Sequence, residues 1–330
     1  MSNNKGIIAV YATIILIFAG LCGITIMRYL SPNLKLQKRR IIKLKNECTI
    51  ESGFEIGLFN INKDVLFRAD GTETCPFINY RFNERDIKVS VCEINGQKSR
   101  LVICSELKNG DQKSIQVSVN TPLLYTIVTK NRLNQNFLSV IKGDVYIEKE
   151  GEFEGSIQGY VSCIENTDIN GKDIRKSITT EKLIIPEYDR NWIEKQDDMI
   201  RILNSRVTEL KLRDKKLYRR GNLTISDSDL KDCCIFVDGD LTIENRFNLS
   251  STKYVPSIVV LGDIFIVTDN AELEGLIDAT GKITLNGTGS VKGTIISESL
   301  EIYGKWDFNW NKELLYKFPH IKPEIKITRF

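Results

Sequence analysis

The chain has 330 residues, of which 27% are charged and 42% hydrophobic, and this balance is typical of a folded globular protein rather than a disordered one. Its net charge of +3 is too small to indicate by itself that the protein binds nucleic acid or an anionic surface. The single histidine, His320, disfavours histidine-based catalysis and a histidine-rich metal site.

The cysteines do not follow a known metal or redox spacing. None of the eight forms a Cys-x-x-Cys pair, which excludes the common zinc and thioredoxin motifs. Two interpretations stay open. Most of the cysteines are small buried hydrophobic residues, or a disulfide forms among Cys75, Cys92 and Cys104 in an oxidising compartment.

The first distinctive segment is an uncharged apolar stretch from Gly6 to Met27. About 20 such residues span a bilayer as a helix, so residues 7–27 are predicted to form a transmembrane helix. A cleaved secretory signal is disfavoured because the apolar run continues past Ala19-Gly20-Leu21. A lipoprotein site is disfavoured because Leu21 precedes Cys22.

The charges that flank this stretch bear on its orientation. Only Lys5 precedes it, whereas seven basic residues follow before the first acidic residue, Glu47. The positive-inside rule alone would therefore place the C-terminal body in the cytoplasm.

The helical pattern continues beyond the apolar stretch, and one helix is predicted over residues 7–61. Pro32 lies within it and predicts a kink near Leu30. Apolar residues then recur at steps of about three and four: Ile41, Ile42, Leu44, Cys48, Phe54, Leu58 and Ile61.

Residues 62–132 are predicted to form an antiparallel β meander. Residues 86–94 alternate apolar and polar side chains, and Asn95-Gly96 is a strong hairpin signal. Residues 100–105 form the return strand, and Asn109-Gly110-Asp111 predicts a second turn before a strand over 114–119.

An internal repeat dominates the rest of the chain. It consists of a glycine, a short polar residue and then an apolar-x-apolar triplet, and its last copies are spaced by about 17 to 23 residues. Such a short unit buries its apolar face only by stacking on its neighbours, so residues 133–330 are predicted to form a β-solenoid. A β-sandwich with coincidental glycine turns is the alternative. The copies start at Gly143, Gly221, Gly239, Gly262 and Gly281, and a degenerate one starts at Ser299.

Two parts of this region depart from the repeat. Between about 187 and 220, apolar residues from Trp192 to Leu217 keep mostly three-, four- and seven-residue steps, which predicts a helical insertion packed on the solenoid or used in self-association. Residues 304–330 are aromatic and basic, and they are predicted to cap an open end of the solenoid. The aromatic residues are Trp306, Phe308, Trp310, Tyr316 and Phe318.

No catalytic motif is present. The sequence lacks a P-loop, a dinucleotide-binding glycine motif, a nucleophile elbow and a zinc-protease motif. Some β-solenoids are carbohydrate-active through grouped acidic residues, but the aspartates here occupy mostly turn or outward positions. We therefore expect no enzyme activity, catalytic residue, cofactor, metal, nucleic-acid partner or small-molecule substrate. The aspartates are Asp238, Asp240, Asp263, Asp269 and Asp278.

The N-terminus resembles type IV prepilin-like proteins, which are the minor pilins and pseudopilins. Their short polar leader ends in glycine before an apolar helix, so residues 1–6 would be the leader, cleaved by a prepilin peptidase between Gly6 and Ile7. Residues 50–58 (IESGFEIGL) are similar to the segment in which many minor pilins leave this helix. The family typically has glutamate at the fifth mature position, where this chain has Tyr11, which favours a minor over a major subunit.

The resemblance implies an α+β, mainly β protein: a long N-terminal transmembrane helix, a β meander and a β-solenoid. It implies a non-enzymatic subunit of a type IV pilus or secretion filament that contacts the membrane and, through its N-terminal helix, other pilin or pseudopilin subunits. The soluble body would lie outside the cytoplasm, against the charge rule. The repeat also resembles bactofilins, so a membrane-anchored cytoplasmic scaffold is one alternative, and an envelope-anchored carbohydrate-active protein is another.

Overall fold

The computed structural model describes residues 4–82, 84–136, 138–164, 167–171, 174–179, 182–185, 187–251, 256–317 and 324–329. The chain forms two compact units. The first contains residues 1–92, 102–116 and 328–330, and the second contains residues 93–101 and 117–327.

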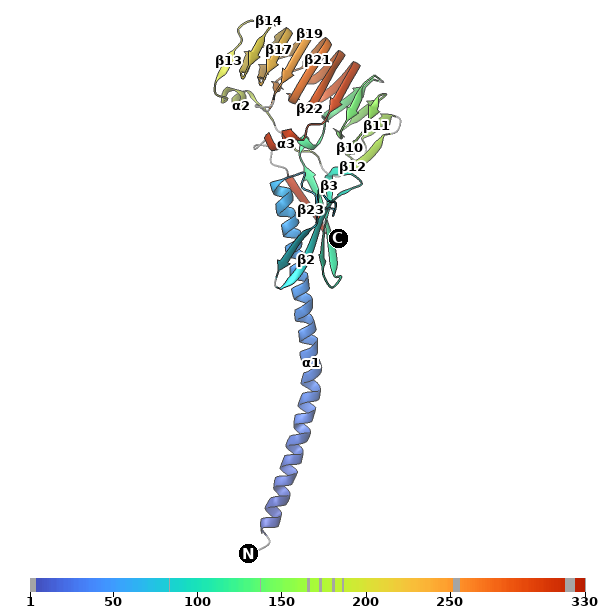
Figure 1. The fold of residues 1–330 in the computed structure, drawn as a ribbon, viewed down its shortest axis with the longest axis vertical. Helices are drawn as coiled ribbons and strands as arrows, with labels where there is room; N and C mark the ends of the chain where they lie inside the picture. Colours follow the sequence, from blue (N-terminus) through green and yellow to red (C-terminus); the bar gives the residue numbers. More distant parts are fainter. Residues whose placement is uncertain are drawn as a thin grey trace. The chain divides into compact units, whose positions relative to one another are not determined.

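One helix, α1 (Asn4–Lys63), begins the chain, and Figure 1 shows it as a single continuous element. It exceeds the predicted range of 7–61 by a few residues at each end. Pro32 lies inside it without ending it. Proline removes one backbone donor, and a long helix tolerates that loss because its other hydrogen bonds remain.

A five-stranded sheet has the order β1-β2-β3-β4-β23. Its meander contains the hairpins predicted from the sequence. Asn95 and Gly96 both have positive φ angles, 54° and 77°, as a two-residue hairpin turn requires. The C-terminal strand β23 completes the sheet beside β4, which the sequence did not predict. The strands are β1 (Ile78–Phe82), β2 (Arg85–Ile94), β3 (Gln97–Leu107), β4 (Gln112–Asn120) and β23 (Glu324–Arg329).

The second unit is a β-solenoid, as predicted, and its neighbouring coils pair through parallel strands. A 3-10 turn, η1 (Pro122–Leu124), precedes it. The strands that come first along the chain are β5 (Ile127–Gln135), β6 (Val140–Lys142), β7 (Val145–Ile147), β8 (Glu150–Phe153), β9 (Ser156–Ile157), β10 (Tyr160–Ile164), β11 (Asp168–Gly171) and β12 (Arg175–Thr179).

A short helix, α2 (Arg190–Glu194), separates these strands from the later ones, and a second, α3 (Glu313–Lys317), follows them. The later strands are β13 (Met199–Arg201), β14 (Arg206–Thr208), β15 (Lys211–Arg213), β16 (Lys216–Arg220), β17 (Leu223–Lys231), β18 (Cys234–Asp238), β19 (Leu241–Ser250), β20 (Ile258–Val260), β21 (Ile264–Ala279) and β22 (Lys282–Asn309).

The repeat forms aligned ladders through successive coils. The first apolar residue of the motif is in register from Leu223 to Leu241, Ile264 and Ile283, and all four are buried in the solenoid interior. The intervening residue faces outward, as the two-residue period of a strand requires. Each copy therefore buries its apolar pair only because the next coil covers it.

The polar residue of the motif links neighbouring coils. The side-chain oxygen of Asn222 accepts a hydrogen bond from the Asp240 amide at 2.9 Å. A carboxylate oxygen of Asp240 likewise accepts a hydrogen bond from the Asp263 amide at 2.9 Å. Asp263 accepts from the Lys282 amide at 2.8 Å. A Cβ at Gly239 would lie 2.7 Å from the Asn222 side-chain oxygen, so the glycine leaves room for this bond. Each of these copies of the repeat therefore forms a corner of the solenoid that a hydrogen bond joins to the next coil.

This corner predicts different effects for two substitutions at Asp240. Asp240→Ala removes the acceptor of the Asp263 amide and should lower the free energy of unfolding by about 0.5–1.5 kcal/mol. Asp240→Asn keeps an acceptor oxygen, as Asn222 does one coil earlier, and should cost less. Urea unfolding of the full-length protein in detergent measures both. Equal losses would show that the hydrogen bond does not stabilise the corner.

The chain enters the solenoid in the middle. β5 pairs with β7 and β8 on one side and with β22, the last solenoid strand, on the other. The early coils, from β5 to β12, extend away from this junction. The late coils start at the far end with β13 and return to it, so that Ile127 lies in register with Ile295. Figure 1 shows the late strands as a stack of parallel layers.

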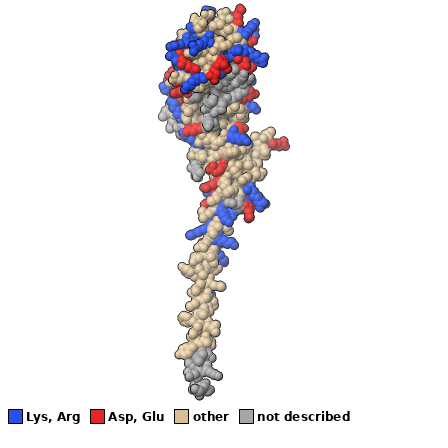
Figure 2. All heavy atoms as spheres, turned by 90° about the vertical axis from the view of Figure 1, so that its left-hand side faces the viewer, with Lys and Arg blue, Asp and Glu red and all other residues tan. Residues whose placement is uncertain are grey.

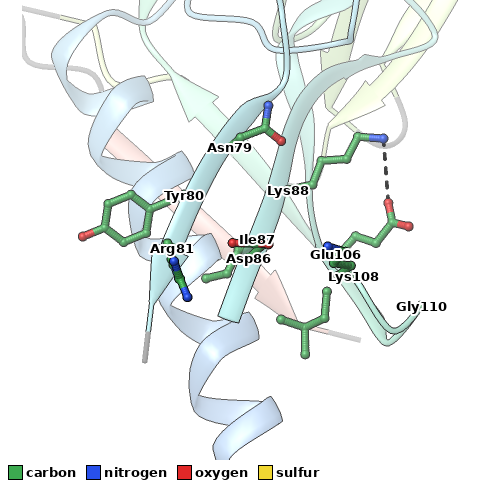
Figure 3. A pocket seen from close by; sticks show the side chains of 10 residues that line it. Asn79, Tyr80, Arg81, Asp86, Ile87, Lys88, Glu106, Lys108 and Gly110 are labelled. Atoms are coloured by element: carbon green, nitrogen blue, oxygen red, sulfur yellow. Dashed lines mark ion pairs between the residues drawn. The ribbon is translucent and has the colours of Figure 1, made fainter. Parts of the chain in front are cut away.

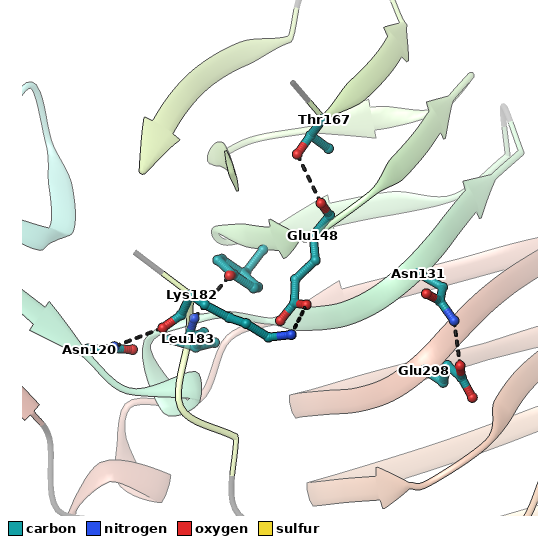
Figure 4. A network of polar contacts seen from close by, with 8 residues as sticks. Asn120, Asn131, Glu148, Thr167, Lys182, Leu183 and Glu298 are labelled. Atoms are coloured by element: carbon teal, nitrogen blue, oxygen red, sulfur yellow. Dashed lines mark hydrogen bonds and ion pairs between the residues drawn. The ribbon is translucent and has the colours of Figure 1, made fainter. Parts of the chain in front are cut away.

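A strap, residues 182–185 and 187–198, connects the two sets of coils. At one end, the Lys182 ammonium pairs with Glu148 at 2.7 Å and the Leu183 amide donates to the Tyr146 hydroxyl at 3.0 Å (Figure 4). At the other end, Arg190 pairs with Asp238 at 2.6 Å. The strap therefore contacts both β7 and β18, which lie several coils apart in the sheet.

The predicted helical insertion at 187–220 is wrong. Only α2 is helical there, and residues 199–220 form the first of the late coils, from β13 to β16. Ile202, Val207, Leu212 and Leu217 all pack toward the core at five-residue steps, because each short strand is followed by a tight corner. Glu209 and Asp214 make two of these corners with positive φ angles of 56° and 57°.

The predicted aromatic cap is also wrong for residues 304–317. Trp306 and Phe308 are fully buried in the interior, in the part of β22 that pairs with β6 near the middle of the stack. Their size fills the space inside a coil rather than closing an end. Phe318 lies outside the described residues.

Candidate functional site: the N-terminal helix

The first part of α1 is apolar and exposed. From Tyr11 to Met27 every side chain is exposed, for example Leu16 at 73%. A soluble protein rarely leaves so many neighbouring apolar side chains in water, so this surface requires a lipid or protein partner. By length and composition alone, α1 could cross a membrane.

The predicted processing site lies at the start of this helix. Gly6 and Ile7 belong to α1, but their side chains, like residues 1–3 of the leader, are outside the described part of the chain. Cleavage between Gly6 and Ile7 therefore stays a prediction. Tyr11, at the fifth position after the predicted cleavage point, is 64% exposed.

The last part of α1 is packed. Ile50, Phe54, Leu58 and Ile61 are buried on one face at three- and four-residue steps. This is the segment in which the sequence resembles minor pilins. The same helix thus has an exposed apolar part and a part that belongs to the core of the first unit.

Two glycines set how closely α1 lies against the sheet. A Cβ at Gly53 would overlap the Ser105 hydroxyl of β3, and a Cβ at Gly57 would lie 2.7 Å from Cγ2 of Ile103. The two positions are four residues apart and therefore share one helix face. Gly57 was missed in the sequence, although its spacing from Gly53 could have indicated a close contact.

From Arg28 to Lys45, between these two parts, α1 carries only positive charge. Figure 2 shows an uncharged length of helix followed by a group of Lys and Arg side chains. All of them are exposed. We call these residues the cationic collar: Arg28, Lys35, Lys38, Arg39, Arg40, Lys43 and Lys45.

The cysteines are free thiols in the structure. The interpretation that most cysteines are buried holds for only three of the eight, Cys163, Cys233 and Cys234. Cys75, Cys92 and Cys104 are half-buried, and Cys22 and Cys48 are exposed. Burial and then the neighbouring Cys104 thiol raise the pKa of Cys92, which disfavours its reactive thiolate. Cys75, Cys92 and Cys104 form no disulfide in this structure, and its formation in an oxidising compartment stays a prediction.

A surface pocket of the first unit contains several charged side chains. This pocket of about 570 Å³ lies beside β1, β2 and β3 (Figure 3), and an ion pair in its lining, between Lys88 and Glu106, is long at 3.9 Å and exposed. Exposed pairs of this kind contribute little energy. The pocket is lined by Asn79, Tyr80, Arg81, Asp86, Ile87, Lys88, Glu106, Leu107, Lys108 and Gly110.

The five aspartates considered above for carbohydrate chemistry have separate structural environments. Asp240 and Asp263 form the corner hydrogen bonds, Asp238 pairs with Arg190, and Asp269 is exposed. Within the described ranges, no group of three or more His, Cys, Asp or Glu side chains could hold a metal ion. A groove on the solenoid contains Glu152 and Glu154 instead, and Glu152 pairs with Arg132 at 2.9 Å.

Asp278 has an environment that the sequence did not indicate. Its side chain is buried beside Tyr188 of the strap, with one carboxylate oxygen lacking a hydrogen-bond partner among the described residues. Burial raises the pKa of Asp278 to about 7, and Lys130 partly opposes this shift.

Comparisons with known proteins find little. No family model and no curated protein matches the sequence. Among solved structures, the chain is similar to the competence-associated pilin ComZ from Thermus thermophilus, with a TM-score of 0.43 and 9% identity over 86% of this chain and 97% of that chain.

Proposed function

We propose that this protein is a minor pilin-like structural subunit of a type IV pilus or a related secretion filament. One observation carries the proposal: α1 is a continuous helix whose first part is apolar and exposed, while its last part packs on an antiparallel sheet through Gly53 and Gly57. The exposed part of such a helix would anchor the protein, while the packed part joins the helix to the folded body.

The exposed apolar part accounts for both states of such a subunit. Before assembly, the bilayer removes residues 7–27 from water. In a filament, the helices of neighbouring subunits bury the same side chains against one another. Other pilin or pseudopilin subunits would therefore be the partners, and the body would lie outside the cytoplasm.

Two features favour a minor subunit. Tyr11 replaces the glutamate that could pair with a neighbour's N-terminal amine, so the subunit would lack that buried ion pair. The solenoid also adds a large body, from Ile127 to Asn309, to the helix and sheet. A repeated lattice accommodates such a body poorly, whereas a cap or a priming subunit can carry it. This function requires no catalysis.

The mature N-terminus tests the proposal. The full chain is expressed in a host with a prepilin peptidase and in the same host without it, and its N-terminus is determined by intact mass and peptide mapping. We expect the chain to start at Ile7 only when the peptidase is present. Gly6→Leu should block cleavage, and Ser2→Ala should not.

A chain that starts at Met1 or Ser2 in both hosts would contradict the proposal and favour the cytoplasmic scaffold. Labelling of the exposed Cys48 with a membrane-impermeant maleimide in intact cells provides a second readout. Protection in intact cells and labelling after lysis would place the body in the cytoplasm.

A further inference from the structure

The cationic collar of α1 lies on the exposed surface of the helix. Its seven side chains are exposed, and within the described ranges none of them forms an ion pair. No acidic residue precedes Glu47, so the first 46 residues carry only positive side-chain charge. The collar is therefore a concentrated charge, although the whole chain has a net charge of only +3.

The collar begins where the apolar stretch ends. Met27 is the last residue of that stretch and Arg28 the first cation. Tyr29 follows Arg28 directly. It is 75% exposed and of the residue type that gathers at membrane–water interfaces. A membrane that receives residues 7–27 must therefore place Arg28 at the level of its phosphate groups.

The cations also cover more than half of the helix circumference. Successive residues turn by about 100°, so the seven positions spread over about 220° around the axis, from Lys45 to Arg40. A helix that tilts toward any direction within this arc brings some of them to the membrane surface. This arrangement fits a layer of anions around the helix better than a single acidic partner on one side.

We propose that the cationic collar binds the headgroup phosphates of anionic phospholipids at the surface of the membrane that anchors the protein. The inference rests on the membrane anchoring in the proposed function, but it does not depend on leader cleavage or on which side the body faces. Clusters of four to eight Lys and Arg next to a membrane helix bind anionic lipid through charge attraction. The collar would thereby fix how deeply α1 sits.

Distance from the membrane divides the collar into two parts. At about 1.5 Å per residue, Lys38 lies about 15 Å along the helix from Arg28, and Lys45 about 25 Å. Charge attraction is screened over about 8–10 Å at physiological salt, so cations near Arg28 should contribute most. This difference supplies a matched pair of variants that remove the same charge.

The test uses full-length protein in a non-ionic detergent. The protein is titrated separately with dioleoyl phosphatidylglycerol and dioleoyl phosphatidylcholine, and bound lipid is counted by native mass spectrometry. The proximal variant carries Arg28→Gln, Lys35→Gln and Lys38→Gln. The distal variant carries Arg40→Gln, Lys43→Gln and Lys45→Gln. Unchanged circular dichroism and melting verify that both variants fold.

We expect the unmodified protein to bind phosphatidylglycerol at least tenfold more tightly than phosphatidylcholine. A cation near the surface contributes about fivefold, so the proximal variant should lose most of this preference and the distal variant less than threefold. Equal binding of the two lipids, or equal losses in the two variants, would overturn the inference. An uncleaved N-terminus would contradict the pilin proposal and leave this result unaffected.

Discussion

Gly287→Ala should destabilise the solenoid by about 2–5 kcal/mol. Gly287 has a φ angle of +99°, which costs an L-residue about 1–2 kcal/mol. A Cβ there would also overlap the backbone carbonyl oxygen of Thr268 in the neighbouring coil. Because that atom belongs to a paired strand, the two coils must separate, which adds about 1–3 kcal/mol. Urea unfolding of the full-length protein in detergent measures the loss.

Gly221→Ala is the matched control for this substitution. Gly221 has a similar φ angle, +89°, but a Cβ there would meet no atom within 4 Å. The control should therefore lose only the conformational part, about 1 kcal/mol. If both variants lost the same stability, close coil contact at Gly287 would not be what requires a glycine.

The sequence predicted the coils of the solenoid but not their order. Alternation such as Leu223 and Ile225 around Thr224 determines which side chains face inward. It does not determine which coil lies next to which, because all the interior ladders are similarly aliphatic. The pairing of Ile127 with Ile295 joins segments far apart in sequence, and no local pattern encodes it.

The two errors have different physical origins. Ile202, Val207, Leu212 and Leu217 follow five-residue steps, and together with nearby apolar residues they imitate helical spacing. Glu209 and Asp214 form corners with positive φ angles, and such a conformation is unusual for glutamate. The residue types alone therefore did not indicate a corner there. We predicted that Trp306 caps the solenoid, because the repeat did not indicate an interior wide enough for so large a side chain.

The candidate site was easier to predict, because its features are local. An uncharged stretch, a run of cations and the segment around Gly53 can each be identified in the sequence alone. What the sequence could not provide was the partner of Gly53. Its contact with Ser105 and the contact of Gly57 with Ile103 depend on a sheet that forms about 50 residues later.

Asp278→Asn should stabilise the protein at pH 8 by up to about 4 kcal/mol and have little effect near pH 4. Burial raises the pKa of Asp278 from 3.8 to about 7, a difference that corresponds to about 4 kcal/mol. The nearest residues in register, Val259 and Ile296, are apolar and do not stabilise a charge. Asparagine has the shape of the protonated carboxyl group but never ionises.

The direction of the pH dependence follows from proton binding. Between pH 3.8 and about 7 the folded state holds a proton on Asp278 that the unfolded state has released. Stability from this group is therefore present at low pH, falls as the pH rises through this window and is constant above it. The Asn variant should lack this fall, whereas Asp269→Asn, at an exposed position, should retain it.

Urea unfolding in detergent at pH 4, 6 and 8 measures these curves. Parallel curves for the unmodified protein and Asp278→Asn would mean that the carboxylate finds a partner or water when it ionises. A difference in the free energy of unfolding that grows with pH would instead show that the ionised Asp278 carboxylate destabilises the folded protein.

Because Tyr188 of the strap lies near this carboxyl group, ionisation should first weaken the contact between the strap and the solenoid. Hydrogen exchange at residues 187–194 should therefore rise with pH in the unmodified protein, beyond the intrinsic increase measured in Asp278→Asn.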